Sequence, residues 1–151
     1  VPRPLGQAFL LVRVSWACLA ASLAVAILIE LGLAPARAGL LFVLLLVPGW
    51  LLTFLLGVLQ RIVPFLASVH ASRAPLVSSL TPAGVLATHA VLHLAALAAL
   101  FSAVLLDSEM LLKAGAAAGL AGALAYAAFF TFVLLKVRHH GIHPPHQPAT
   151  A

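Results

Sequence analysis

Four long apolar runs, separated by short polar segments, dominate the chain. They cover residues 8–33, 38–70, 82–106 and 109–139. Each run exceeds the roughly 20 residues that an α-helix needs to cross the hydrocarbon core of a bilayer. The runs are uniformly apolar and lack the alternation of membrane-barrel strands, which favours helices. The pattern therefore predicts an all-α fold, an integral membrane four-helix bundle that occupies residues 1–140.

Prolines and glycines mark the ends and the weak points of these predicted helices. Pro35 ends the first helix, because the residue before a proline disfavours helical geometry. Pro48 and Gly49 fall inside the second apolar run and predict a kink there. Pro64 predicts a second bend near the end of the same helix. Residues 141–151 contain three prolines and two histidines, and they are expected to form a flexible tail.

Composition supports a lipid environment for most of the chain. The sequence is 64% hydrophobic and 7% charged, whereas a soluble domain carries roughly 25% charged residues. So few charges cannot cover a globule with a solvated surface. The single cysteine, Cys18, lies in the first apolar run, so no disulfide within the chain is expected.

Charged residues are distributed unevenly between the two ends of the predicted bundle. With four spans, both termini fall on one side, which holds six basic residues and no acidic one: Arg3, Arg13, Arg61, Arg73, Lys136 and Arg138. The other side holds two basic and all three acidic residues: Arg37, Lys113, Glu30, Asp107 and Glu109. The positive-inside rule then predicts a bacterial inner-membrane protein with both termini cytoplasmic. The basic residues form no groove, so no nucleic-acid partner is expected.

All seven histidines lie on the same basic side of the predicted bundle. His89 and His93 are four residues apart and share one helix face, and His70 ends the preceding helix. Three imidazoles from adjacent helices at one depth are candidate ligands for haem iron or a transition metal. The alternative is that these side chains only bond backbone carbonyls or serines. The tail histidines lie on a flexible segment and are weaker candidates: His139, His140, His143 and His146.

A stripe of small residues follows one face of the last predicted helix. Gly115, Gly119 and Gly122 have the spacing that lets a second helix approach closely. No Ser/His/Asp set, phosphate-binding loop, Cys pair or paired intramembrane carboxylates occur, so the sequence gives no support for catalysis.

One segment resembles a known motif. Residues 57–70 read Gly-Val-Leu-Gln-Arg-Ile-Val-Pro-Phe-Leu-Ala-Ser-Val-His. This is similar to Gly-Met-Leu-Tyr-Lys-Ile-Val-Pro-Phe-Leu-Val-Trp-x-His in the C-terminal part of bacterial polytopic membrane proteins related to the haem–copper oxidase subunit I superfamily. The resemblance implies a respiration-linked membrane protein in which His70 matches the motif's histidine. The chain lacks that family's paired His-x-His and its His-Pro-Glu helix, which implies a tail fragment or a reduced, non-catalytic relative.

These observations predict a non-catalytic subunit or module of a larger bacterial membrane complex in energy transduction, respiratory or photosynthetic. Its expected partners are the lipid bilayer and other membrane subunits. The first alternative is a haem- or metal-binding protein that uses His70, His89 and His93, with a role in electron transport. The second is a small transporter or channel, which is less favoured because no span carries a charge near its middle.

Overall fold

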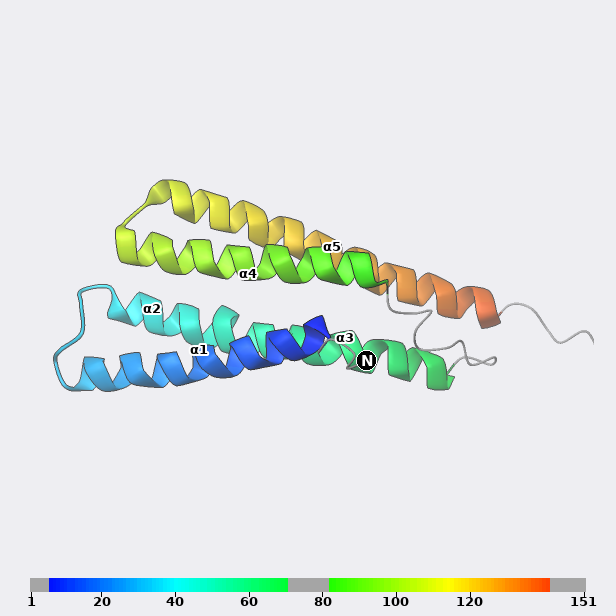
Figure 1. The fold of residues 1–151 in the computed structure, drawn as a ribbon, viewed down its shortest axis with the longest axis horizontal. Helices are drawn as coiled ribbons and strands as arrows, with labels where there is room; N and C mark the ends of the chain where they lie inside the picture. The colour runs from blue at the N-terminus through cyan, green and yellow to red at the C-terminus, as the bar shows by residue number, and fades with distance from the viewer. Residues whose placement is uncertain (1–5, 71–81, 142–151) are drawn as a thin grey trace, which may run out of the picture.

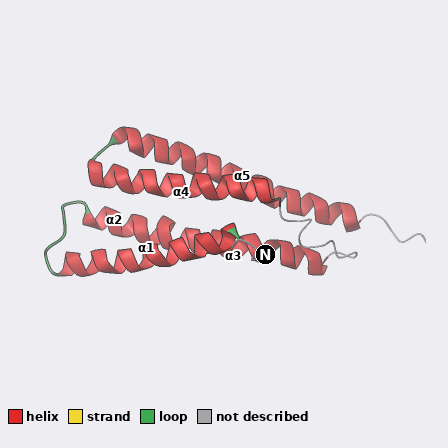
Figure 2. Ribbon diagram, in the orientation of Figure 1, coloured by secondary structure: helices red, strands yellow, loops and turns green. Residues whose placement is uncertain are grey.

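The computed structural model describes residues 6–70 and 82–141, which fold into two antiparallel helical hairpins lying side by side (Figure 1). The first hairpin pairs α1 (Gln7–Glu30) with a long second helix built from α2 (Ala38–Leu44), η1 (Leu45–Leu52) and α3 (Thr53–His70). The second hairpin pairs α4 (Ala83–Leu106) with α5 (Glu109–Gly141). Both described parts of the chain are helical apart from their turns and contain no strand (Figure 2). The predicted all-α class is thus confirmed for these residues.

Among the described residues, four helices are long and apolar enough to cross a membrane. They span Ala8–Glu30, Ala38–Val69, Ala83–Leu106 and Glu109–Arg138. Large apolar side chains such as Ile27, Val91 and Leu120 are exposed on the outside of the hairpins. An outer surface of this kind suits lipid as the surrounding medium. The prediction of membrane-spanning helices is therefore supported at the level of helix length and composition.

The two short connections lie at the same end of the molecule (Figure 1). α1 ends at Glu30, three residues before the predicted Leu33, because Gly32 adopts a φ of 67° and turns the chain. At the second connection, Asp107 adopts a φ of 53°. The Ser108 hydroxyl then accepts a hydrogen bond from the Leu111 amide at 3.4 Å, at the start of α5.

A π-helical segment stands where the sequence predicts a kink. η1 contains Pro48, which has no amide hydrogen and cannot continue the regular α-helical ladder. Gly49 follows and lies against α1, where an added Cβ would meet Cys18 Cβ and Sγ at 3.1 Å. The wider π turn and the missing side chain together bring η1 close to α1, with Cys18 packed between them.

Packing within each hairpin is more extensive than packing between the two hairpins. α4 is the most buried of the spanning helices. A Cβ added at Gly115 or Gly122 of α5 would meet Leu100 or Leu92 of α4, and one added at Gly119 would meet Ala96 of α4. The small-residue stripe therefore lies inside the second hairpin. Away from the short connections, Leu86, Phe129 and Val133 form a buried apolar cluster against α3.

Several features predicted from the sequence lie outside the described residues. These are the N-terminal residues 1–5, the loop 71–81 and the tail 142–151. The side chains of His70, His139 and His140 are also outside the described part of the structure.

Candidate functional site

A cavity of about 360 Å³ lies between the two hairpins. Its walls come from η1, α3, α4 and α5, and most of them are aliphatic. Three side chains with polar atoms interrupt this apolar surface: His89, His93 and Tyr126. An apolar hollow with a few convergent polar groups is the usual form of a small-molecule site.

His89 lines this cavity and has one ring nitrogen without a hydrogen-bond partner in the described structure. The residue is 2% exposed, and its Nδ1 lies 2.9 Å from the backbone oxygen of Gly122 in α5. A carbonyl oxygen only accepts hydrogen bonds, so Nδ1 carries the proton and donates it. Nε2 of the neutral ring is then an acceptor with a free lone pair, and it is buried with no hydrogen-bond partner among the described residues.

His93 differs from His89 because its Nε2 has a hydrogen-bond partner. Its Nε2 lies 2.8 Å from Thr53 Oγ1, and the same hydroxyl lies 2.8 Å from the carbonyl oxygen of Pro48. The hydroxyl must donate its single proton to the carbonyl, so it accepts from His93 Nε2–H. The Nε2 atoms of the two neighbouring imidazoles therefore have opposite protonation. The rings are stacked with centroids 5.7 Å apart.

The local sequence around Pro48 explains how Thr53 reaches His93. In an α-helix a threonine hydroxyl bonds the carbonyl three or four residues back. In this helix the acceptor is five residues back, because the π turn of η1 shifts the register by one residue. The irregular helix thus joins the first hairpin to the second through a buried side-chain hydrogen bond.

Tyr126 supplies the third polar group of the cavity. Its ring lies 4.9 Å from the ring of His89 and 5.6 Å from that of Phe129, measured between centroids. Its hydroxyl is buried and has no hydrogen-bond partner among the described residues. A phenol hydroxyl both donates and accepts, whereas His89 Nε2 in this tautomer only accepts.

After His89 Nε2 and Tyr126 Oη, Gln60 Nε2 is the third buried polar atom without a hydrogen-bond partner in the described structure. The residue is 3% exposed, and its Nε2 makes no hydrogen bond there. Gln60 shares one face of α3 with Thr53 and Leu56, because these positions are three to four residues apart. Leu56 lines the cavity, so Gln60 lies one helical turn beyond it on the face toward the second hairpin.

The structure brings together part of the predicted histidine set. His89 and His93 line one cavity, but Nε2 of His93 bonds Thr53, and the side chain of His70 is not described. Within residues 6–70 and 82–141, no group of three or more His, Cys, Asp or Glu side chains is placed to hold a metal ion. The three-histidine site stays a prediction.

Sequence reasoning missed Thr53 and Tyr126. A signal for each is present in the sequence: Tyr126 is the single tyrosine of the chain and lies inside an apolar span. Thr53 is a hydroxyl residue five positions after the proline that breaks the helix. Polar side chains inside a span are expensive unless they have a role.

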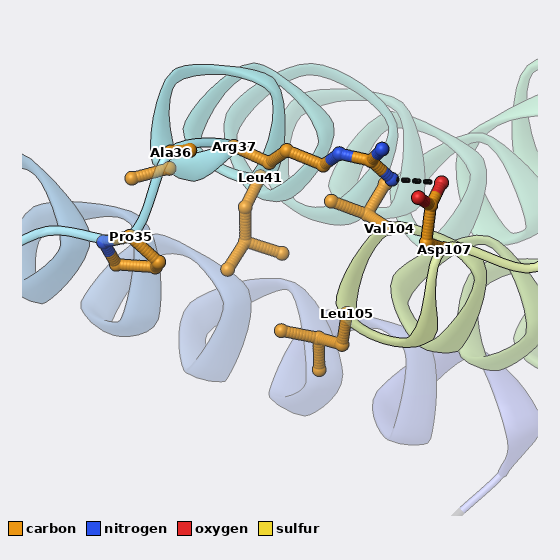
Figure 3. A pocket seen from close by; sticks show the side chains of 8 residues that line it. Pro35, Ala36, Arg37, Leu41, Val104, Leu105 and Asp107 are labelled. Carbon is orange, nitrogen blue, oxygen red and sulfur yellow. Dashed lines mark hydrogen bonds and ion pairs between the residues drawn. The ribbon is translucent and has the colours of Figure 1, made fainter.

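A second pocket, of about 290 Å³, lies at the end with the short connections (Figure 3). Arg37, which precedes α2, reaches across to form an ion pair with Asp107 at the end of α4. The hydrogen bond and charge of Arg37 hold the pKa of Asp107 below its usual value, and Asp107 raises the pKa of Arg37. Because the charged groups satisfy each other, this pocket is a weaker site than the central cavity.

Comparison of the chain with known protein families, characterised proteins and solved structures finds no match.

Proposed function

We propose that this protein is a non-catalytic membrane module that binds a lipid-soluble ligand in the cavity between its hairpins. One observation carries the proposal. His89, which lines the apolar cavity, donates Nδ1–H to the Gly122 carbonyl, and its Nε2 is a buried acceptor without a partner in the described structure.

The energetics favour an occupant for this site. A buried polar atom without a partner costs about 1–3 kcal/mol, and two such atoms, His89 Nε2 and Tyr126 Oη, belong to residues lining this cavity. A ligand that bonds both atoms removes this cost when it binds. The rigid placement of His89 on two packed helices also lowers the entropic cost of binding.

The membrane placement in this proposal follows the charge count. We place the module in the bacterial inner membrane with both chain ends in the cytoplasm, because the ends of the hairpins away from the short connections carry the excess of basic residues. Cysteines added at the N-terminus and at the C-terminus of the chain are both expected to react with a membrane-impermeant reagent only from the cytoplasmic side. Labelling from the opposite side would contradict this placement. Membership of a larger energy-transducing complex stays a prediction from the sequence, as does the transporter or channel alternative.

Haem is the second candidate occupant, and the unpaired Nε2 of His89 also favours it. A histidine that ligates iron typically donates its other ring N–H to a carbonyl, as His89 does to Gly122. A bare transition-metal ion fits less well, because it takes several protein ligands and the described cavity offers one unpaired imidazole nitrogen. His89 would hold the haem iron, and haem would supply electron-transfer chemistry there.

Binding to the purified protein tests the proposal. Titration with lipid-soluble aromatic compounds is expected to raise the unfolding temperature in detergent, because a ligand of the folded state stabilises it by mass action. Substitution of His89 by Phe should abolish the shift, whereas the control Val91→Ala, on the lipid-facing side of the same helix, should retain it. A Soret band that disappears in the His89 variant would favour haem. Absence of both signals would refute a ligand-binding role.

A further inference from the structure

Two residues that line the cavity, His89 and Tyr126, each have a buried polar atom without a partner, and these atoms specify more than an apolar ligand. His89 Nε2 is an acceptor only, because the Gly122 carbonyl fixes the proton on Nδ1. For Nε2 to donate instead, the ring would have to protonate or give up its bond to the carbonyl. A ligand that bonds this atom must therefore bring a proton donor.

Tyr126 Oη completes the hydrogen-bonding pattern. Its ring lies 4.9 Å from the His89 ring, so the two polar atoms belong to neighbouring rings of one cavity. A hydroxyl group has both functions that these atoms call for, since it can donate to His89 Nε2 and accept from the Tyr126 hydroxyl. A ligand carbonyl or ether can accept from Tyr126 but leaves Nε2 unpaired.

The cavity walls indicate the rest of the ligand. A volume of about 360 Å³ falls at the small end of the range for small-molecule sites. The rings of His89, His93 and Tyr126 line part of it, and aliphatic side chains line most of the remainder. Aromatic rings pack well in offset or edge-on contact with such side chains.

We infer that the cavity selects a lipid-soluble ring that carries a hydroxyl group, of the phenol or quinol class, over the corresponding ether or quinone. This inference rests on the proposed ligand-binding function and names the chemistry that the site recognises. It concerns binding alone and involves no electron transfer. The selectivity arises because the wrong ligand leaves a buried acceptor unpaired, which is how polar sites reject analogues that lack a hydroxyl.

Two matched ligand pairs test the inference on the unmodified protein. The first pair is 4-pentylphenol and its methyl ether, and the second is decylubiquinol and decylubiquinone. Binding constants come from ligand-dependent shifts in unfolding temperature in detergent. We expect the hydroxyl form of each pair to bind about tenfold more tightly, the effect of one net hydrogen bond. Nitrogen-15 spectra of labelled histidine should show that the ring of His89 keeps its proton on Nδ1 and that Nε2 shifts when the phenol binds.

Variants separate this inference from the proposed function. His89→Gln introduces an amide that both donates and accepts, so it should keep binding and lose the preference for the hydroxyl form. Tyr126→Phe should weaken all four ligands. Equal binding of both members of each pair to the unmodified protein would overturn the hydroxyl inference and leave the ligand-binding function standing. Binding of none of the four, with no Soret band, would overturn both. Binding of haem alone, lost in His89→Phe, would overturn the hydroxyl inference in favour of the second candidate.

Discussion

Individual polar side chains in the interior divide into those with partners and those without. Thr53 and His93 bond each other across the hairpins, while Gln60 Nε2, His89 Nε2 and Tyr126 Oη have no partner in the described structure. Substitution should change the free energy of unfolding in opposite directions in the two groups. Removing one partner of a bond strands the other, whereas removing an unpaired atom removes a cost.

Thr53→Val is expected to destabilise the protein by roughly 1–2 kcal/mol. Valine keeps the shape of threonine, but it leaves His93 Nε2–H and the Pro48 carbonyl without their bonds to the hydroxyl. Unfolding by a denaturing detergent measures the change. Thr88→Val is the matched control, because the Thr88 hydroxyl is exposed and bonds only Gly84 in its own helix. An equal loss in both variants would contradict a bond that joins the hairpins.

Tyr126→Phe is expected to raise the free energy of unfolding of the ligand-free protein by about 1 kcal/mol. The substitution removes a buried hydroxyl without a partner and keeps the ring packed between His89 and Phe129. The same unfolding assay, carried out after extensive delipidation, provides the measurement. A clear decrease in stability would mean that the hydroxyl has a partner in the folded protein.

At the scale of helices, close approach depends on a few glycines. In the first hairpin Gly57 of α3 faces α1, where an added Cβ would lie 3.0 Å from the Ala8 carbonyl oxygen and 3.1 Å from Val12 Cγ2. The carbonyl belongs to a helix backbone and cannot move aside as a side chain can. Without a hydrophobic force between helices in lipid, such close contacts are a main source of association.

Gly57→Ala is therefore expected to cost about 1–3 kcal/mol, since the helices must separate to admit the methyl group. Gly39→Ala in α2 serves as the control, because nothing lies within 4 Å of its added Cβ. Alanine has the higher helix propensity, so the control should be neutral or slightly stabilising. Comparable losses in the two variants would exclude close helix packing as the cause.

At the scale of the whole molecule, polar side-chain contacts in the described part of the chain join the two hairpins. Thr53 and His93 bond in the interior, and Arg37 pairs with Asp107 at the end with the short connections. Between these contacts the surfaces are apolar and fit loosely enough to leave the central cavity.

The Arg37–Asp107 pair predicts a pH dependence. Arg37 lowers the pKa of Asp107, so the pair stabilises the folded state above the ordinary aspartate pKa of ~3.9. This stabilisation is lost as the pH falls through the lower pKa of the folded state. The stability difference between the unmodified protein and Asp107→Asn should therefore disappear on acidification from ~6 to ~2, as measured by the unfolding temperature.

The difference should also be small and sensitive to salt, because both groups are exposed. Glu109→Gln is the control, because Glu109 pairs with Lys113 one turn away in the same helix, α5. That ion pair does not connect the two hairpins. In an Arg37→Gln background the effect of Asp107→Asn should disappear, and the effect of Glu109→Gln should stay unchanged. Persistence of the Asp107 effect in that background would contradict the role assigned to the ion pair.

The sequence by itself determined the all-α class and the four long apolar helices. Run length and hydropathy are local properties of the sequence, and the thickness of the bilayer core sets the helix length that they must match. The sequence also singled out His89 and His93 as neighbours on one face, since helical spacing alone fixes that relation. Only the tertiary structure decided that the Gly122 carbonyl accepts a hydrogen bond from His89 and that Thr53 bonds His93. It also decided that the ring of Tyr126 packs against that of His89. These contacts join residues 33 to 40 positions apart. The contacts of His89 follow from how α4 packs on α5, and the bond between Thr53 and His93 depends on the π turn and on how the two hairpins pack. No local sequence pattern encodes these packing arrangements.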